Sequence, residues 1–220
     1  MKNAGRMLTL VALAGLACGP SRAAEQEAPT LTLTGENTVI KSYGEHYAAA
    51  WLQYYLIKCV ARHPDAMKYS CYVRYEKGEK RIDRSAAPVF PISQEKELPA
   101  DQVAIVVGTL NHLPAEYLGP DERNRLEQKR GSILVKRKGN VILLAKNSLN
   151  PWAFGHITTF LDKVCGIRLY APSLPGQNEE EPWLSMPEKN EVTVGRLGLF
   201  MKPYFAKTAW SSGGHQRNVE

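Results

Sequence analysis

Carboxylates are the first residues to consider for chemistry, because an enzyme that cleaves a bond to a sugar needs two of them, one kept protonated. Asp121, Glu122 and the run Glu179–Glu181 lie in polar stretches rich in Pro and Gly, where solvated surface is the default. Asp162 lies among apolar residues at helical spacing, but Lys163 follows it and a surface position explains it equally well. The sequence therefore presents no catalytic acid pair.

The five histidines are the second group, and they form no metal signature. They show neither the i, i+4 pairing on a helix nor a Cys-x-x-Cys partner. His156 falls in an apolar helical pattern, where we expect a core histidine bonded to a neighbouring carbonyl rather than a ligand. A Gly-x-Ser-x-Gly elbow and a phosphate-binding glycine loop are also missing from the sequence, so no cofactor is predicted.

Aromatic side chains are the third group, because their rings can pack against the apolar face of a sugar. Trp51, Tyr55 and Trp152 recur among apolar residues at helical spacing, so we assign them to the core. The candidates for binding lie at strand ends or in loops: Tyr170, Trp183, Tyr204 and Trp210. Packing between domains is the first use we expect for them, since exposed aromatic clusters often mark protein interfaces.

The amino terminus has the three parts of an export signal. Lys2 and Arg6 precede an apolar run from Met7 to Cys18, and small residues at Ser21 and Ala23 suit cleavage before Ala24. The run is too short to span a bilayer, so no stable membrane span is predicted. We favour plain cleavage, with release to the periplasm or medium, over a lipid anchor on Cys18, because Gly15 stands where lipoprotein signals usually carry Leu.

Export also bears on the remaining cysteines and on the net charge. A disulfide between Cys59 and Cys71 would close a short loop, and Cys165 is most simply a buried thiol.

The whole chain carries a net charge of +6, with 28 basic and 22 acidic residues. Three of the cations lie in the leader, which has no acidic residue, so the exported chain carries +3. That balance does not favour a nucleic-acid partner.

Two helices are predicted to position these residues. Between Gly44 and Val60, apolar residues recur every three or four positions, as on a helix packed against a sheet. The second helix begins with Asn150 as N-cap and Pro151 in the first turn, and it ends at Gly166. A shorter solvated helical turn is expected over residues 120–128.

Several short strands complete the prediction. Val103–Val107 is a continuous apolar run that suits a strand near the centre of a sheet, and residues 132–136 and 140–145 flank a tight turn as in a hairpin. Residues 31–34 and 38–40 suggest an opening hairpin, Pro88–Ile92 an edge strand, Ile167–Tyr170 a short strand and Val192–Val194 a closing strand. The economical fold is α+β, a mixed sheet with two main helices on one face.

The order of these motifs resembles a known family. Val103–Thr109 ends in Gly-Thr, the hairpin strand at Gly139–Lys146 follows, and Pro151-Trp152-Ala153-Phe154 leads through Phe160-Leu161 to the segment Gly166–Pro172. This order is similar to the non-catalytic α+β domain that precedes the barrel in family 20 β-hexosaminidases (their domain 2) and in α-glucuronidases. It is most similar to the version in large secreted bacterial proteins of the DUF4838 type. The resemblance spans about residues 30–195.

The resemblance implies a domain plan. Residues 1–23 are the signal peptide, 24–30 a tether, 31–195 the α+β domain, and 196–220 a linker or the start of a catalytic domain. A barrel needs about 250 residues and cannot fit in the last segment. The apolar stretch Leu197–Met201 would have to be exposed or folded back, so we expect the chain to be poorly soluble and to improve on deletion after about residue 195.

The functional expectation follows from that plan. It is a non-catalytic accessory domain of a secreted glycoside hydrolase-like protein, whose partner is a catalytic barrel in the same chain or in a separate one. The alternative is a free-standing module that binds a polysaccharide or another protein, and a small independent enzyme ranks last because no acid pair is present. Arg168 and Tyr170 stand where the family-like motif leaves the sheet and complete the candidate binding set.

Overall fold

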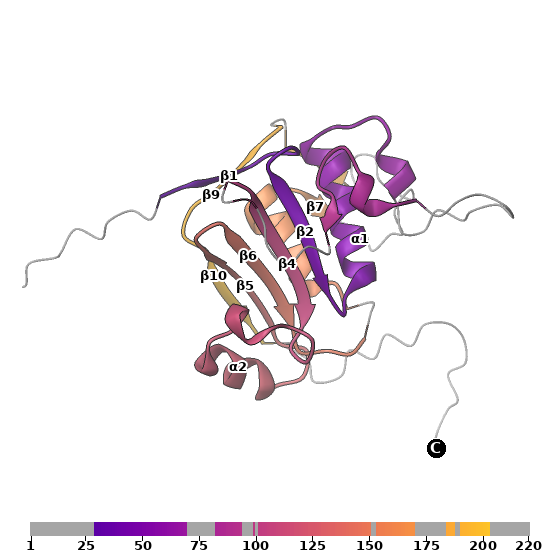
Figure 1. Cartoon of the computed structure of the whole chain (residues 1–220). Coiled ribbons are helices and arrows are strands. Elements are labelled where there is room, and N and C mark those ends of the chain that lie inside the picture. The colour runs from indigo at the N-terminus through magenta and orange to yellow at the C-terminus, as the bar shows by residue number, and fades with distance from the viewer. Residues whose placement is uncertain are drawn as a thin grey trace, which may run out of the picture.

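Strand β4 (Val103–Thr109) lies inside a six-stranded mixed sheet, and each of its seven residues is buried (Figure 1). It belongs to a computed structural model that describes residues 29–69, 82–93, 99, 101–150, 153–169, 184–187 and 190–202. A run of β-branched and apolar residues without polar alternation suits burial on both faces, which is why the sequence predicts this central position correctly.

The sheet combines a parallel half and an antiparallel half. Strands β2 (Thr38–Tyr43), β4 and β6 (Val141–Lys146) run parallel to one another, and β3 (Ile92–Ser93) extends this half at the edge. Strand β5 (Ile133–Lys138) forms the predicted hairpin with β6, and β10 (Gly198–Met201) pairs antiparallel with β5 at the opposite edge. The carboxyl ends of β2, β4 and β6 therefore meet at one end of the sheet.

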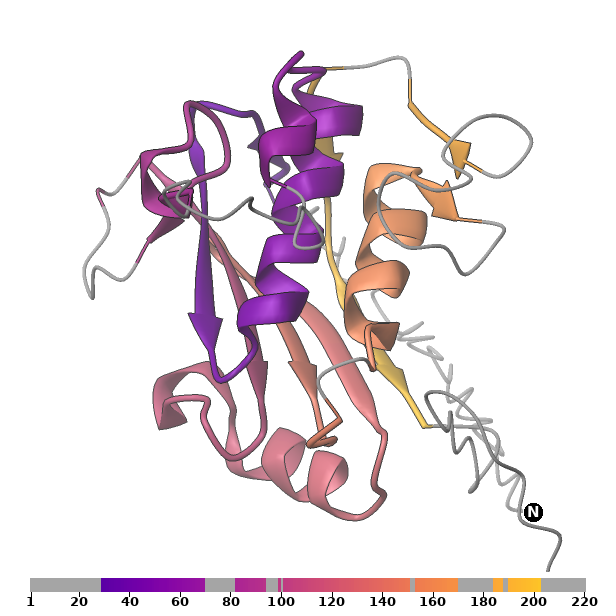
Figure 2. The same cartoon turned by 90° about the vertical axis from the view of Figure 1, so that its right-hand side faces the viewer.

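Two helices cover one face of this sheet (Figure 2). Helix α1 (His46–Tyr55) continues into a π-helical turn, η1 (Leu56–Val60), and α3 (Gly155–Phe160) continues into a second one, η5 (Leu161–Cys165). Both elements pack on Ile105, Val107 and the other inward residues of the sheet. The α+β class and the two helices on one face are confirmed.

From Ala48 onward helix α1 is buried on all sides, because residues Ala48–Tyr55 are all inaccessible or nearly so. Its aromatic residues bind it to the neighbouring helix: the Trp51 ring stacks on Phe154, with centroids 4.9 Å apart and planes 12° apart. The assignment of Trp51 and Tyr55 to the core is confirmed, and Trp152 lies outside the described residues.

Helix α3 begins later than the sequence suggests. Its N-cap is Phe154, which makes no side-chain cap, so the prediction of Asn150 as N-cap is wrong. The backbone N–H of Ala153 instead donates to Asn150 O. The helix ends as predicted at Gly166, whose φ of 72° is left-handed and suits glycine.

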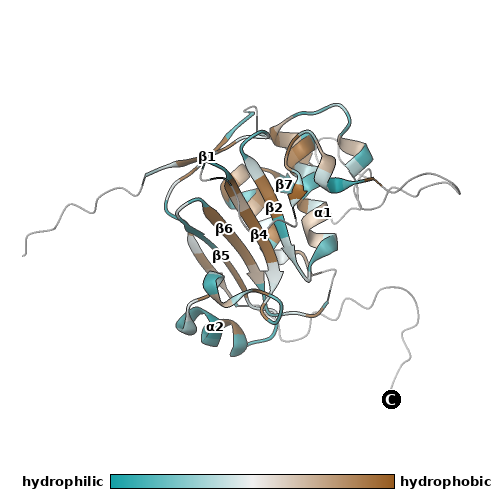
Figure 3. Cartoon of the chain, viewed as in Figure 1, coloured by the Kyte–Doolittle hydropathy of each residue, from teal (hydrophilic) through white to brown (hydrophobic). Residues whose placement is uncertain are grey.

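A smaller apolar layer lies on the second face of the sheet. Helix α2 (Pro120–Glu127) and the loop before it place Leu126, Leu113 and Leu118 against Val106 and Leu143. The helix contributes little else to the core, because its other side chains after Pro120 are polar (Figure 3). Its first turn is capped by Glu122, whose Oε2 accepts from Gly119 N at 2.9 Å.

Short strands close the ends of the domain. Strand β1 (Leu31–Leu33) pairs with β9 (Val192–Val194) rather than with β2, so the predicted opening hairpin is wrong. The turn at residues 35–37 still exists, but it redirects the chain from one sheet to another. Strand β7 (Arg168–Leu169) pairs with β8 (Leu184–Ser185), and single helical turns form η2 (Ala66–Tyr69), η3 (Arg84–Ala86) and η4 (Ala115–Tyr117).

The apolar stretch after Gly195 is part of the sheet. Gly198–Met201 forms β10, and Leu197 and Leu199 pack against the main core. The folded domain therefore extends past residue 195, and the interpretation of residues 196–202 as linker is wrong. Strand β9 is likewise not the closing strand.

Candidate functional site

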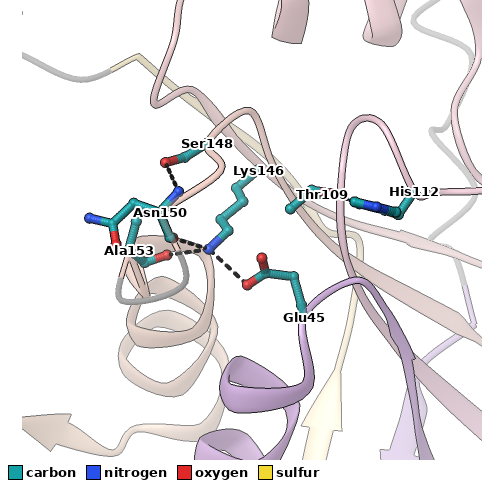
Figure 4. Close-up of polar contacts among 7 residues, drawn as sticks. All are labelled: Glu45, Thr109, His112, Lys146, Ser148, Asn150 and Ala153. Carbon is teal, nitrogen blue, oxygen red and sulfur yellow. Dashed lines mark hydrogen bonds and ion pairs between the residues drawn. The ribbon is translucent and has the colours of Figure 1, made fainter.

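The carboxyl ends of the three parallel strands bring together several of the buried polar residues of this domain. Glu45 follows β2 and precedes α1, Thr109 ends β4, and Lys146 ends β6. This end of a parallel sheet is where α/β proteins commonly bind ligands. Figure 4 shows Glu45 and Lys146 facing one another, with the loop of Asn150 and Ala153 beside them.

Lys146 has a complete set of partners inside the protein. Its Nζ lies 2.7 Å from Glu45 Oε2 and donates to the carbonyl oxygens of Asn150, at 2.8 Å, and Ala153, at 3.2 Å. The side chains of Lys146 and Glu45 are only 1% and 4% exposed. An ammonium group has three hydrogens, and here three acceptors surround it. The lysine therefore ties together the end of β6, the start of α1 and the loop that leads to α3.

Burial shifts the pKa values of both partners. Removal from water raises the pKa of Glu45, and the hydrogen bond and charge of Lys146 oppose that shift. Removal from water lowers the pKa of Lys146, and Glu45 opposes that shift in turn. Each charge thus depends on the other for its stability in the interior.

His156 lies beside this pair and is fully buried. Burial, together with the nearby charge of Lys146, lowers its pKa from 6.5 to about 3, so the imidazole is neutral at ordinary pH. Both ring nitrogens lack a hydrogen-bond partner. The histidine is in the core as predicted, but the expected bond to a neighbouring carbonyl is wrong.

His112 approaches the same end of the sheet from outside. Thr109 Oγ1 lies 2.7 Å from His112 Nδ1. The imidazole packs against the backbone of Gly44, where an added Cβ would lie 2.5 Å from Nδ1, and the φ of Gly44 is 72°. The sequence gives no sign of this contact, because the two residues are 68 positions apart along the chain.

Two surface pockets include neither Glu45 nor Lys146 in their lining. The first, of about 330 Å³, includes Ser42, His46 and Asp83 in its lining. These three residue types could form a nucleophilic triad, but the buried Ser42 Oγ has no hydrogen-bond partner, and Asp83 accepts from the Ser85 N–H at 2.9 Å. The Ser85 contacts also lower the pKa of Asp83. This pocket has no assembled catalytic machinery.

The second pocket, of about 500 Å³, contains one of the predicted binding residues. Arg168 is exposed and its Nε lies 3.1 Å from Asp162 Oδ1. Asp162 also contacts Lys163 at 2.9 Å, and the pKa of Asp162 is lowered by Lys163 first and Arg168 second. The surface position expected for Asp162 is confirmed. The remaining binding candidates, Tyr170, Trp183, Tyr204 and Trp210, lie outside the described residues.

The predicted disulfide is likewise beyond what the described residues cover. Cys59 is fully buried in the main core, and Cys71 lies outside them, so the pairing stays a prediction. Cys165 is a buried thiol, as predicted, and burial strongly raises its pKa. Within the described ranges, no group of three or more His, Cys, Asp and Glu side chains could hold a metal ion.

No protein-family model matches the sequence, and curated proteins give no significant match. Among the helices of the described part, none combines the length and apolar character needed to cross a membrane.

The residues that the sequence did not single out are Glu45 and Lys146. A weak signal was present, because each is a charged residue at or shortly after the carboxyl end of a largely buried strand. Their pairing joins positions 101 residues apart, which no local pattern predicts.

Proposed function

We propose that this chain contains a non-catalytic accessory domain of a secreted carbohydrate-active protein, and that it supports a catalytic domain supplied in the same chain or separately. The association with carbohydrates rests on the motif order resembling the domain before the barrel of β-hexosaminidases and α-glucuronidases. Export to the periplasm or medium rests on the leader sequence, with a lipid anchor at Cys18 as the alternative.

The main support for the non-catalytic assignment is the burial of the Glu45–Lys146 pair and its contacts within the fold. General acid–base chemistry needs a group that can reach a substrate. Here the ammonium group of Lys146 is paired with Glu45 and donates to two backbone carbonyls, and neither of the two pockets described above is lined by Glu45 or Lys146. These are the properties of a buried ion pair that stabilises the fold. We name Glu45, Lys146 and the carbonyls of Asn150 and Ala153 the clasp.

The fold is compatible with a supporting role. Strand β10 places the end of the described chain at a sheet edge, next to the pocket that includes Arg168 and Met201. Met201 is 49% exposed there. A domain that continued from Lys202 would begin beside this surface.

The test is to read the DNA downstream of codon 220 and to express the longest product. We expect a reading frame that encodes a barrel and aryl-glycosidase activity in the long product. The chain of 220 residues alone should have none. Absence of a barrel, or hydrolysis by the short chain that one carboxylate substitution abolishes, would overturn the proposal.

A free-standing binding module is the second candidate. The observation in its favour is the pocket of about 500 Å³ with Arg168 and Asp162 on its rim. A screen of immobilised glycans with the full chain tests it, with Arg168→Ala as the variant and Arg62→Ala, an arginine elsewhere on the surface, as the control. Equal retention of both variants on every glycan would remove this candidate.

A further inference from the structure

A row of cations lies on the second face of the β5–β10 edge, away from the clasp. Lys136 and Lys138 alternate along β5 on the side of α2, since Lys136 contacts Glu122 of that helix and the charge of Lys138 also acts on Glu122. On β10, Phe200 faces the same side, and Lys202 follows it two residues later. Arg125 of α2 reaches the same surface.

Arg125 is held in place by an aromatic ring rather than by a carboxylate. Its guanidinium carbon lies 4.3 Å from the centroid of Phe200. A guanidinium stacked on a ring keeps its N–H groups available in its own plane, where they can bind a carboxylate or sulfate group. The arrangement therefore prepares an anion contact.

The register of β5 and β10 fixes the shape of this surface. Gly198 lies opposite Lys136 and Phe200 opposite Leu134. Same-face positions on a strand are about 7 Å apart, so the row from Lys138 to Lys202 extends over roughly 20 Å. We name Arg125, Lys136, Lys138 and Lys202 the cationic strip.

The strip is open and poorly neutralised. Arg125, Lys138 and Lys202 are exposed, and within the described part of the chain no carboxylate forms an ion pair with any of them. Only Lys136 has such a partner, Glu122. A Cβ added to Gly198 would meet nothing within 4 Å, so the middle of the strip offers free space beside the half-buried Phe200 ring.

We propose that the cationic strip binds an acidic polysaccharide, a chain of sugars that carries carboxylate or sulfate groups. The proposal deepens the proposed function, on which it rests for the sugar nature of the ligand. The row of cations matches the repeated charge of such a chain, and the open space at Gly198 leaves room for a sugar beside the stacked Arg125 and Phe200 side chains.

The test is to measure the binding of the full chain to polygalacturonate, dextran sulfate and neutral dextran, by affinity electrophoresis and by titration calorimetry. We expect binding to at least one charged polymer, none to dextran, and a steep loss of affinity with added salt. Preference for polygalacturonate would identify the carboxylate as the recognised group, and preference for dextran sulfate would identify the sulfate.

The decisive variant is Lys138→Glu with Lys202→Glu, which should raise Kd by at least about tenfold. The matched control is Arg62→Glu with Lys68→Glu, because both side chains are exposed elsewhere on the surface and the change in net charge is the same. We expect the control to change Kd by less than about twofold. Gly198→Glu should also abolish binding without loss of folding, since its space is open.

Three results would overturn the proposal: no binding to either charged polymer, equal losses in the strip and control variants, or tighter binding to DNA or to vesicles of phosphatidylglycerol. These outcomes leave the accessory role untouched, because that role is tested by the downstream barrel and its activity. Conversely, absence of a barrel would not affect the polymer titration.

Discussion

Two charged regions of this domain use their cations in opposite ways. At the carboxyl ends of the parallel strands, Lys146 is 1% exposed and its ammonium group is surrounded by acceptors of the same chain. At the β5–β10 edge, Lys138 and Lys202 are exposed and have no carboxylate partner among the described residues. The number of partners separates a charge that stabilises the fold from one that is available to another molecule.

The difference follows from the cost of burial. A charge in the interior must be paired and hydrogen-bonded, because its removal from water costs several kcal/mol. A charge at the surface gains about 1 kcal/mol or less from a nearby opposite charge, so it can stay unpaired at little cost. The clasp is therefore the region where substitution should affect stability most, and the strip is the region where it should affect binding.

The largest effect is expected from Lys146→Met. This change leaves the Glu45 carboxylate and the carbonyls of Asn150 and Ala153 without their donor, and loss of one partner of a buried ion pair costs about 3–5 kcal/mol. Unfolding in urea, followed by far-UV circular dichroism, measures the free energy of unfolding.

The double variant Glu45→Gln with Lys146→Met is the control for this prediction. It removes both charges, so it should be more stable than Lys146→Met alone. If Lys146→Met proves too unstable to purify, Glu45→Gln gives the comparison. A loss below about 1 kcal/mol in both single variants would show that the clasp does not stabilise the domain.

The second effect is a pH dependence caused by His156. Its pKa is about 3 in the folded protein and near 6.5 in the unfolded chain, so the unfolded chain binds more protons between these values. Stability is therefore unaffected above about pH 7 and falls as the pH drops below about 6.5. Between pH 7 and pH 4.5 the loss attributable to His156 is about 2–3 kcal/mol.

The measurement compares the wild-type protein with His156→Leu over that range. Because other acidic groups also titrate there, the test is the difference between the two proteins at each pH. We expect the free energy of unfolding of His156→Leu, relative to that of the wild type, to increase as the pH falls. A difference that stays constant from pH 7 to pH 4.5 would contradict the assignment of a neutral, buried imidazole.

The sequence predicts the regular parts of this fold better than its polar contacts. The helix over residues 44–60, the central strand at Val103 and the hairpin of β5 and β6 follow from hydrophobic periodicity and a local turn, and the structure confirms them. The partner of β1 and the addition of β10 to β5 could not be predicted, because both pairings join distant segments. The clasp and the strip depend on the same long-range register.

Truncation gives the smallest effect and separates the two regions most directly. A chain ending after Gly195 lacks β10 and the packing of Leu197 and Leu199, and it leaves the edge of β5 uncovered. With partial burial of these side chains and loss of the strand hydrogen bonds, we expect about 2 kcal/mol less stability. A chain ending after Lys202 is the control with which the shorter truncation is compared, because β10 and the strip are both retained in it. Since the clasp lies elsewhere, the shorter truncation should lose polymer binding while the effect of Lys146→Met on stability stays the same. Undiminished stability after removal of β10 would instead favour the original domain limit at residue 195.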